Sequence, residues 1–355
     1  MKIAQLSSPW IALPPLKYGG TERVVSNLTE ELVKRGHEVT VFATGDSRTS
    51  ANLSYYYKTA LSQDPKMKSD PLVWLHSFHE CFKRAGEFDI VHNHMQHIGM
   101  FLADLVPGQY LHTIHGNIFE NESPEIKRDV FKRFKNHNFV SISNTQRQGI
   151  PDLNYISTVY NGINPGEFEF GRGKGNYLAW IGRITPKKGL ETAIETAKTL
   201  SIPLKISAYI DPVDMEYFNK IIEPSINGKF IEFLGELHGQ DKTDFLKDAV
   251  ALLFPVTWNE PFGLVMVEAM VCGTPVIAFN RGSVPEVVTN GVNGFIVENG
   301  AEMIEAVKVI GEINREKCRE SVVDKFTVEK MVDGYEEAYK KILSQKSKVK
   351  SQKFK

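Results

Sequence analysis

The sequence predicts an α/β protein with two doubly wound domains, each built on a parallel sheet, and three observations support this. The chain has 355 residues, and at roughly 150 residues per domain that length suggests two domains. Short apolar or β-branched runs alternate with segments of helical periodicity, which is typical of parallel βαβ units. The alternation stops at residues 160–175, a turn-rich and weakly apolar stretch, and then restarts. This stretch is therefore expected to link the domains.

The first domain is expected to cover residues 1–165. Residues 3–6 are predicted to form its first strand, and the proline- and glycine-rich residues 7–20 a long loop. Apolar residues at helical spacing predict a helix at residues 21–35, which Gly36 ends. Further strands are expected at residues 39–43, 89–92, 111–115, 139–143 and 158–160.

The second domain is expected to cover residues 166–325. Its apolar runs predict strands at residues 177–182, 204–208, 231–234, 250–254 and 276–279. Helical periodicity predicts helices at residues 190–200, 264–271 and 301–313. A C-terminal helix at about residues 326–345 is expected to pack back on the first domain, and residues 346–355 form a lysine-rich tail. In such sheets ligands bind beyond the carboxyl ends of the strands, so residues that follow strands are the first candidates for a site.

The composition excludes several classes of protein. With 42% hydrophobic and 24% charged residues, the chain is neither disordered nor collagen-like. Cys81, Cys272 and Cys318 are too few for a disulfide framework and have no metal-ligand spacing, so they are expected to be buried apolar residues in a reducing cytosol. The sequence has no signal-peptide pattern at its start and no run near the roughly 20 apolar residues of a membrane span. A soluble, cytoplasmic protein is expected.

The charge is unevenly distributed along the chain. The net charge of −1 combines +1 for residues 1–165, −9 for residues 166–339 and +7 for residues 340–355. The last segment has seven lysines and no acidic residue. We expect a solvated tail. The alternative is a weak peripheral contact with the acidic inner surface of the membrane. No nucleic acid partner is expected.

Two cations follow the first predicted strand of the second domain. The segment GRITPKKG (residues 182–189) carries Arg183 and Lys188 between a strand and a helix. An arginine can bind a diphosphate as a planar two-pronged donor, and a lysine as a point charge. Taken alone, the segment fits two solvated cations in a loop equally well.

Two glutamates eight residues apart form a second candidate site. Glu260 is expected in a loop after a strand, and Glu268 in the helix that Phe262, Gly263 and Leu264 open. Unpaired N–H groups at a helix start suit an anion or sugar hydroxyls, and Gly263 has no side chain to obstruct their approach. The alternatives are a solvated Glu268 and a Glu260 that only complements the helix dipole. The apolar neighbours of Glu268 favour a buried carboxylate, which needs a partner.

Several segments together resemble one enzyme family. The segments GRITPKKG, NEPFGLVMVEAM, CGTPVIAF, GSVPEVV and NGVNGF resemble the donor-binding half of the retaining glycosyltransferases of family 4 (group 1 glycosyl transferases, GT-B fold). The segments PPLKYGGTERVVSNLTEELVKRGHEVTVFATGDS, FDIVHNH, TIHG, FVSIS and YNGI are similar to the acceptor-binding half, most closely in the avilamycin-type subgroup. The resemblance runs from residue 1 to about 340 and is far more specific than any single motif. It implies two Rossmann-like domains that face each other across a cleft.

The resemblance implies roles for the charged residues of the donor-binding half. Arg183 and Lys188 would bind the donor diphosphate and stabilise charge on the leaving nucleotide. Lys188 is preferred over Lys187, because the family's lysine directly precedes the glycine. Glu260 would hold hydroxyls of the donor sugar, and Glu268 would bind the ribose. The backbone of the helix start would assist Glu260: Phe262, Gly263 and Leu264.

The resemblance also implies roles for the first domain. The loop with Gly19 and Gly20 would approach the diphosphate, and His115 would reach the reacting sugar. For Gly19 and Gly20 the alternative is an ordinary turn before a helix. For His115 the alternative is a histidine that only forms hydrogen bonds within the wall of the cleft. The absence of a G-X-G-X-X-G pattern argues against a nicotinamide site.

The spacing His92, His94 and His97 resembles a set of metal ligands. In a strand, His92 and His94 share a face while His97 falls in the following turn or helix, so a polar strand-end loop is favoured. The aromatic residues 55–57 and Trp74 are expected to pack in the core or against loops, with stacking on an acceptor sugar as the alternative.

Breaking an anomeric C–O bond to a nucleoside diphosphate leaves negative charge on the phosphate, so fixed cations are the main catalytic need. No Asp-X-Asp pair occurs, and neither a metal nor another cofactor is expected. The resemblance implies hexose transfer with retention, from a UDP-, GDP- or ADP-hexose to a glycan, a lipid-linked sugar or a small molecule. The alternatives are a nucleotide-sugar epimerase of the same fold and a non-catalytic nucleotide-sugar-binding protein. The complete set of Arg183, Lys188, Glu260 and Glu268 argues against a non-catalytic binding protein.

Overall fold

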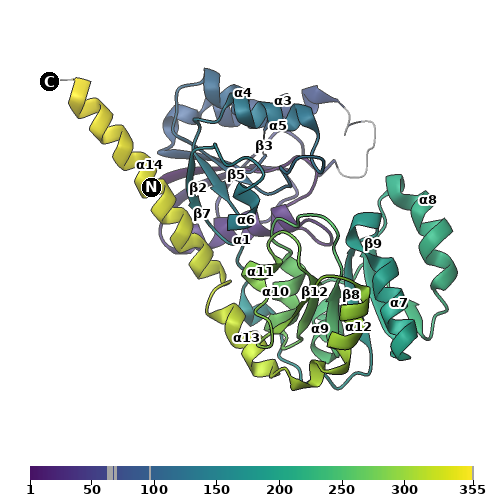
Figure 1. Cartoon of the computed structure of the whole chain (residues 1–355). Helices are drawn as coiled ribbons and strands as arrows, with labels where there is room; N and C mark the ends of the chain where they lie inside the picture. Colours follow the sequence, from purple (N-terminus) through teal and green to yellow (C-terminus); the bar gives the residue numbers. More distant parts are fainter. Residues whose placement is uncertain (62–66, 68–69, 96, 354–355) are drawn as a thin grey trace. The chain divides into compact units, whose positions relative to one another are not determined.

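A computed structural model of the chain describes residues 1–61, 67, 70–95 and 97–353, and for residues 346–353 the backbone alone. The chain divides into two compact units, coloured along the sequence in Figure 1: Met1–Gly162 with Val328–Lys355, and Ile163–Thr327. Each unit is built on its own parallel sheet. Within the described residues, no helix is long and apolar enough to cross a membrane.

The first unit has a seven-stranded sheet in the order β3-β2-β1-β4-β5-β6-β7, with all neighbouring strands parallel. The strands are β1 (Lys2–Leu6), β2 (Glu38–Ala43), β3 (Asn52–Tyr55), β4 (Ile90–Asn93), β5 (Tyr110–Ile114), β6 (Phe139–Ser141) and β7 (Tyr155–Thr158). The chain order reverses between β1 and β4. Ligands bind beyond the carboxyl ends of strands at such a point.

Helices cover this sheet and bury the apolar faces that the sequence predicts. They are α1 (Gly20–Lys34), α3 (Pro71–Lys83), α4 (Ile98–Leu105), α5 (Glu125–Arg133), α6 (Asn144–Arg147) and α14 (Val328–Lys353). In α1, Val24, Val25, Leu28 and Leu32 are at most 1% exposed, and Gly36 follows with a left-handed φ of 84°. The predicted first helix is therefore confirmed to within one residue at each end.

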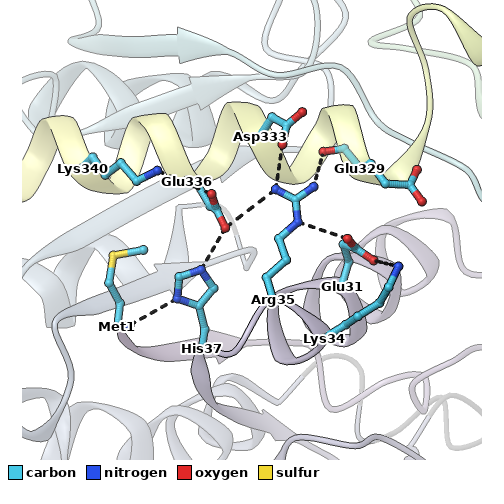
Figure 2. A network of polar contacts seen from close by, with 9 residues as sticks. All are labelled: Met1, Glu31, Lys34, Arg35, His37, Glu329, Asp333, Glu336 and Lys340. Atoms are coloured by element: carbon cyan, nitrogen blue, oxygen red, sulfur yellow. Dashed lines mark hydrogen bonds and ion pairs between the residues drawn. The ribbon is translucent and has the colours of Figure 1, made fainter.

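The last helix, α14, is tied to α1 by the polar network in Figure 2. Arg35, which follows α1, donates to Asp333 (2.7 Å) and to the backbone oxygen of Glu329 (2.9 Å). His37 Nε2 lies 2.9 Å from Glu336 Oε1, and its Nδ1 lies 3.2 Å from the amino group of Met1. The same helix also buries large side chains against the first unit: Val332, Tyr335 and Tyr339 are completely buried.

The second unit has a six-stranded parallel sheet in the order β10-β9-β8-β11-β12-β13. Its strands are β8 (Leu178–Arg183), β9 (Leu204–Tyr209), β10 (Ile231–Phe233), β11 (Ala251–Phe254), β12 (Val276–Phe279) and β13 (Gly294–Val297). Its helices are α7 (Leu190–Leu200), α8 (Met215–Tyr217), α9 (Gly239–Asp248), α10 (Leu264–Val271), α11 (Val284–Val287), α12 (Gly300–Lys308) and α13 (Arg315–Val323). The order reverses between β8 and β11, which places the carboxyl ends of these two strands side by side.

Several sequence predictions of secondary structure need correction. The strands β3 and β13, both four-residue edge strands, were not predicted. The seventh strand lies at Tyr155–Thr158 rather than at 158–160, since its pairing with β6 aligns Thr158 with Ser141. The helix expected at 301–313 ends at Lys308, after which Val309 leaves helical geometry. Of the aromatic residues expected in the core or against loops, Tyr55 and Tyr56 are more than half exposed and lie outside the core, while Tyr56 packs on Tyr57 with 4.9 Å between ring centres. The three cysteines are buried and free, as predicted.

Candidate active site

Arg183 is the last residue of β8, one position before the loop in which the sequence placed it. Its guanidinium forms an ion pair with Asp214, with Nη2–Oδ2 and Nε–Oδ2 distances of 2.8 and 2.9 Å. Asp211 Oδ2 lies 3.7 Å from Nη1. The arginine side chain is 35% exposed, so the guanidinium is held by carboxylates yet remains accessible.

Lys188 lies in the short 3-10 turn Pro186–Lys188 between β8 and α7. Its ammonium donates to Glu260 Oε2 at 2.6 Å and lies 5.3 Å from the ring centre of Trp258. Glu260 follows β11, the strand next to β8, so this ion pair joins the two adjacent strand ends. The neighbouring Lys187 has an exposed side chain.

Glu260 is held by its own loop as well as by the lysine. The indole N–H of Trp258 donates to Glu260 Oε2 at 2.8 Å. The backbone N–H of Ser283 donates to the Glu260 carbonyl (2.9 Å), and its hydroxyl donates to the Phe262 carbonyl (2.9 Å). A side chain at Gly282 would collide with the Glu260 backbone. The GSVPEVV segment therefore fixes the Glu260 loop by close backbone contact.

The helix α10 starts directly after this loop. Gly263 is its N-cap residue, with a φ of 75° that favours glycine. Phe262 is 2% exposed and packs edge-to-face on Phe326, 5.7 Å between ring centres. Its side chain thus belongs to the core, so any contact of Phe262 with an anion or with hydroxyl groups would come from its backbone at the helix start.

Glu268 lies on α10 and is 4% exposed, so the buried alternative is the correct one. Its partner is Lys242 of α9, whose ammonium donates to Oε1 at 2.6 Å. Lys242 is 16% exposed and also lies 5.9 Å from the ring centre of Phe168. A charge on both groups is compatible with burial because each satisfies the other. The sequence predicted the need for a partner but not its identity.

The candidate residues of the first unit lie at two strand ends. Gly19 is the N-cap residue of α1 and Gly20 its first residue, in the connection that follows β1. His115 comes directly after β5 rather than at the end of the strand. Its Nε2 lies 2.9 Å from Nδ1 of His94, which follows β4, and the residue is half-buried. The sequence did not identify His94 as a partner.

Burial keeps the histidines of this region neutral. Burial lowers the pKa of His115, and that of His112, to about 3. The pKa values of His92 and His94 lie well below 6.5, first through burial and then through neighbouring histidines. His97 lies apart, against Phe131. Across the described parts of the chain, no three His, Cys, Asp or Glu side chains form a group that could hold a metal ion.

The second unit thus places its four charged sequence-predicted residues in three ion-paired sets and also holds the predicted helix start at residues 262–264. The first unit holds Gly19, Gly20 and His115. The residues that sequence reasoning missed are partners of these groups: Asp211, Asp214, Trp258, Lys242 and His94. Asp211 and Asp214 follow β9, the other neighbour of β8, so strand-end position is the one signal that could have found them.

Comparison with known proteins agrees with this architecture. N-acetyl-alpha-D-glucosaminyl L-malate synthase of Bacillus anthracis is 26% identical over 364 residues, covering 92% of this chain and 94% of that protein. Sucrose-phosphate synthase of Thermosynechococcus elongatus shares the fold with a TM-score of 0.77, 19% identity and 99% coverage of both chains. Anabaena Alr3699/HepE in complex with UDP-glucose has a TM-score of 0.73 at 17% identity, covering 98% of this chain and 100% of that chain.

Two family models match adjoining parts of the sequence. Glycosyltransferase Family 4 matches residues 18–167, and Glycosyl transferases group 1 matches residues 167–325. The matched segments contain every candidate residue of both units. With its two parallel-sheet α/β units and the structural neighbours above, the chain has the GT-B fold and belongs to the group 1 glycosyltransferases.

Proposed function

We propose that this glycosyltransferase moves a hexose from a nucleoside-diphosphate sugar to a glycan, a lipid-linked sugar or a small-molecule acceptor. The observation that carries the proposal is the pair of cations at and just after the end of β8, Arg183 and Lys188, of which Lys188 is paired with Glu260 in the loop before α10. A guanidinium and an ammonium at one strand end suit a diphosphate. The complexes of Alr3699/HepE with UDP and with UDP-glucose support a nucleotide-sugar donor.

In the proposed reaction the diphosphate takes the place of the carboxylates that now pair with the cations. Asp214 and Glu260 hold Arg183 and Lys188 in position before the donor binds, which lowers the ordering cost of binding. As the anomeric C–O bond breaks, negative charge grows on the phosphate oxygens, and the two cations stabilise it. Glu260, released from Lys188, then accepts hydrogen bonds from hydroxyls of the donor sugar.

The third ion pair, between Lys242 and Glu268, is assigned to the nucleotide. Lys242 occupies Oε1 of Glu268, and the other carboxylate oxygen accepts the ribose hydroxyls of the donor. The buried lysine therefore orients the carboxylate. The backbone N–H groups of Phe262, Gly263 and Leu264 assist at the start of the same helix.

We further propose that transfer retains the anomeric configuration, as in the avilamycin-type subgroup that the sequence resembles. The acceptor would attack from the face that the diphosphate leaves, and the phosphate oxygen would take the acceptor's proton. In this scheme Arg183 and Lys188 supply the positive charge that a metal ion would otherwise provide at the phosphate. Gly19 and Gly20 would approach the diphosphate, and His115 would bind a hydroxyl of the reacting sugar.

The cellular setting is also a proposal. We propose a cytoplasmic enzyme, with the lysine-rich tail as a weak contact for an acidic inner membrane surface. Co-sedimentation with vesicles rich in anionic lipid tests this contact, using the whole chain and a chain truncated after Lys341. Equal binding of both would remove the tail from the proposal.

The function is tested in two steps. A thermal-shift panel of UDP-, GDP- and ADP-hexoses selects the donor, because a ligand that binds only the native state raises its stability. The selected donor is then incubated with and without sugar acceptors, and nucleotide release and product anomer are followed by NMR. Transfer with retention, lost in Glu260→Gln, is the expected result. An inverted anomer would refute retention, and an epimerised or unchanged donor would refute transfer.

A further inference from the structure

A row of buried polar side chains in the first unit links the C-terminal helix α14 to His115. The row has contributions from β1, β4, β5 and α14. Its members before His115 are at most 1% exposed: Gln5, His92, His94, Thr113, Tyr335 and Tyr339. Buried polar groups need hydrogen-bond partners inside the protein, and here they find them in one another.

The contacts form one continuous path. At the far end, the Thr113 hydroxyl donates to Tyr335 (3.1 Å), and His92 Nε2 lies 2.7 Å from the Thr113 oxygen. His92 Nδ1 lies 2.7 Å from the Tyr339 hydroxyl. The amide nitrogen of Gln5 donates to that same hydroxyl (3.2 Å).

The path continues from Gln5 to the candidate sugar-binding histidine. Gln5 Oε1 lies 2.6 Å from Nε2 of His94, and Nδ1 of His94 lies 2.9 Å from Nε2 of His115. Among the hydrogen bonds of the described residues, none engages the other ring nitrogen of His115.

These partners allow one order of protons. Thr113 donates its single proton to Tyr335, so its oxygen can only accept from His92. His92 must therefore carry its proton on Nε2 and donate it to Thr113. Its Nδ1 then accepts a hydrogen bond from the Tyr339 hydroxyl. The Tyr339 oxygen accepts from the Gln5 amide, which leaves Gln5 Oε1 to accept from Nε2 of His94.

The same logic extends to His115. His94 is neutral, because burial keeps its pKa well below 6.5. With its proton on Nε2, it accepts at Nδ1, and the donor there is Nε2–H of His115.

We propose that Tyr339, Gln5 and His94 are positioning residues that hold His115 as the Nε2–H tautomer and leave its Nδ1 to accept a hydrogen bond from a substrate hydroxyl. The substrate part of this inference rests on the proposed transferase function, whereas the proton order does not. Once the substrate covers it, an acceptor of this kind discriminates strongly against a sugar that lacks the hydroxyl, because the nitrogen would then stay unpaired.

The proton order is tested first by NMR on protein with ¹⁵N-labelled histidine rings. Single His→Gln substitutions assign the signals, and ring nitrogen shifts report which nitrogen carries the proton. We expect Nε2–H on both His94 and His115 in the wild-type protein. A proton on Nδ1 of either ring would overturn the proposal.

Tyr339→Phe then tests the origin of this order. Without the hydroxyl, the Gln5 amide is free to turn over, and a second set of His94 and His115 signals is expected. Tyr110→Phe is the matched control, since it removes a hydroxyl that donates to the Val106 carbonyl in the same unit. A single unchanged tautomer in Tyr339→Phe would refute the role of Tyr339. If this variant does not fold, the wild-type spectrum alone decides the proton order.

A double-mutant cycle tests the positioning role in transfer. Tyr339→Phe is expected to lower kcat/KM by roughly fivefold, the effect of one hydrogen bond, and to have no further effect in a His115→Ala background. The same loss in both backgrounds would show a purely structural role and would overturn the positioning claim. Absence of transfer from any donor would refute the proposed function, while the spectrum would still decide the proton order.

Discussion

In the first unit, the polar side chains at the ends of β4 and β5 are neutral and hydrogen-bonded, whereas those at the ends of β8 and β11 in the second unit are charged and ion-paired. His94 and His115 lie 2.9 Å apart, and burial keeps the pKa of both rings far below 6.5. Lys188 and Glu260 form an ion pair at 2.6 Å, with 20% and 12% of their side chains exposed.

The difference shows two ways to prepare a strand end for a ligand. Neutral buried groups keep a fixed hydrogen-bond direction, because changing it would leave a donor or acceptor unpaired. Partly exposed ion pairs can exchange one carboxylate partner for a phosphate at modest cost. In the proposed reaction, the first arrangement suits recognition of a hydroxyl, and the second suits charge that grows during bond cleavage.

The largest expected effect of this difference is on acid stability. His92, His94 and His112 are buried and His115 is half-buried, and all four are neutral, with pKa values well below 6.5 that include about 3 for His112 and His115. Below pH 6.5 the unfolded chain binds protons at these rings and the native chain does not. Each histidine therefore lowers the free energy of unfolding by up to about 1.4 kcal/mol per pH unit as pH falls from 6.5 toward the native pKa.

The four rings together make this loss at most roughly 5 kcal/mol per pH unit, so the first unit is expected to lose stability before the second as pH falls. The one histidine of the second unit, His238, is exposed. Hydrogen exchange measured by mass spectrometry at pH 6.5 and 5, corrected for the intrinsic rate, should show protection lost in peptides of the first unit before those of the second. Equal protection of the first unit at both pH values would contradict the neutral-histidine side of the comparison.

The next largest effect tests the charged strand end. Lys188→Ala removes the ammonium that the proposal places on the diphosphate, and kcat is expected to fall by about 10²- to 10³-fold. Lys187→Ala is the matched control, because that side chain is exposed. Its kcat should stay within about twofold of the wild type, since exposed charges contribute little. Equal losses in the two variants would exclude a specific role for Lys188.

A smaller effect concerns the stability of the buried ion pair. Lys242→Met leaves Glu268, which is 4% exposed, without its cation. The free energy of unfolding is expected to fall by about 3 kcal/mol in urea titrations. Adding Glu268→Gln should restore most of the loss, because the uncompensated charge is then gone. Lys220→Met, which breaks the exposed pair with Glu216, should cost less than about 0.5 kcal/mol. Similar losses in the two lysine variants would show that burial of Glu268 is unimportant.

Much of the fold was predictable because most helices and buried strands lie where the local sequence pattern places them. The bounds of α7 and α10 match the predicted helices at both ends, and each helix begins directly after a glycine. The strands that sequence reasoning missed or misplaced, β3, β13 and β7, depend on pairing with a neighbour rather than on their own residues. Non-local contacts of this kind leave no local pattern.

The candidate site shows the same division. Arg183, Lys188, Glu260 and Glu268 were found from their segments because each motif is contiguous. Their partners were not, since Asp214 and Lys242 lie on other segments without a motif. The contact between Gln5 and Tyr339 joins residues 334 positions apart, so the path that orders the His115 proton is visible only in the folded chain.

The smallest expected effect concerns a buried carboxyl in the first unit that contrasts with Glu268. Glu22, in the first turn of α1, is 8% exposed and accepts a hydrogen bond from the Ser8 hydroxyl at 2.8 Å. Burial raises its pKa above the ordinary value of 4.5, an effect that outweighs the hydrogen bond. The native state therefore binds a proton that the unfolded state has released, and this group lowers stability as pH rises above 4.5.

Glu22→Gln should accordingly raise the free energy of unfolding by about 1 kcal/mol at pH 8, because the amide stays neutral and its oxygen still accepts from Ser8. The gain should shrink toward zero as pH approaches 4.5. Glu125→Gln is the control, since Glu125 occupies the first turn of α5 with an exposed side chain. It should lose a few tenths of a kcal/mol through the helix dipole. A loss of stability in Glu22→Gln at pH 8 would mean that the charged carboxylate stabilises the fold, and the first unit would then hold charge as the second one does.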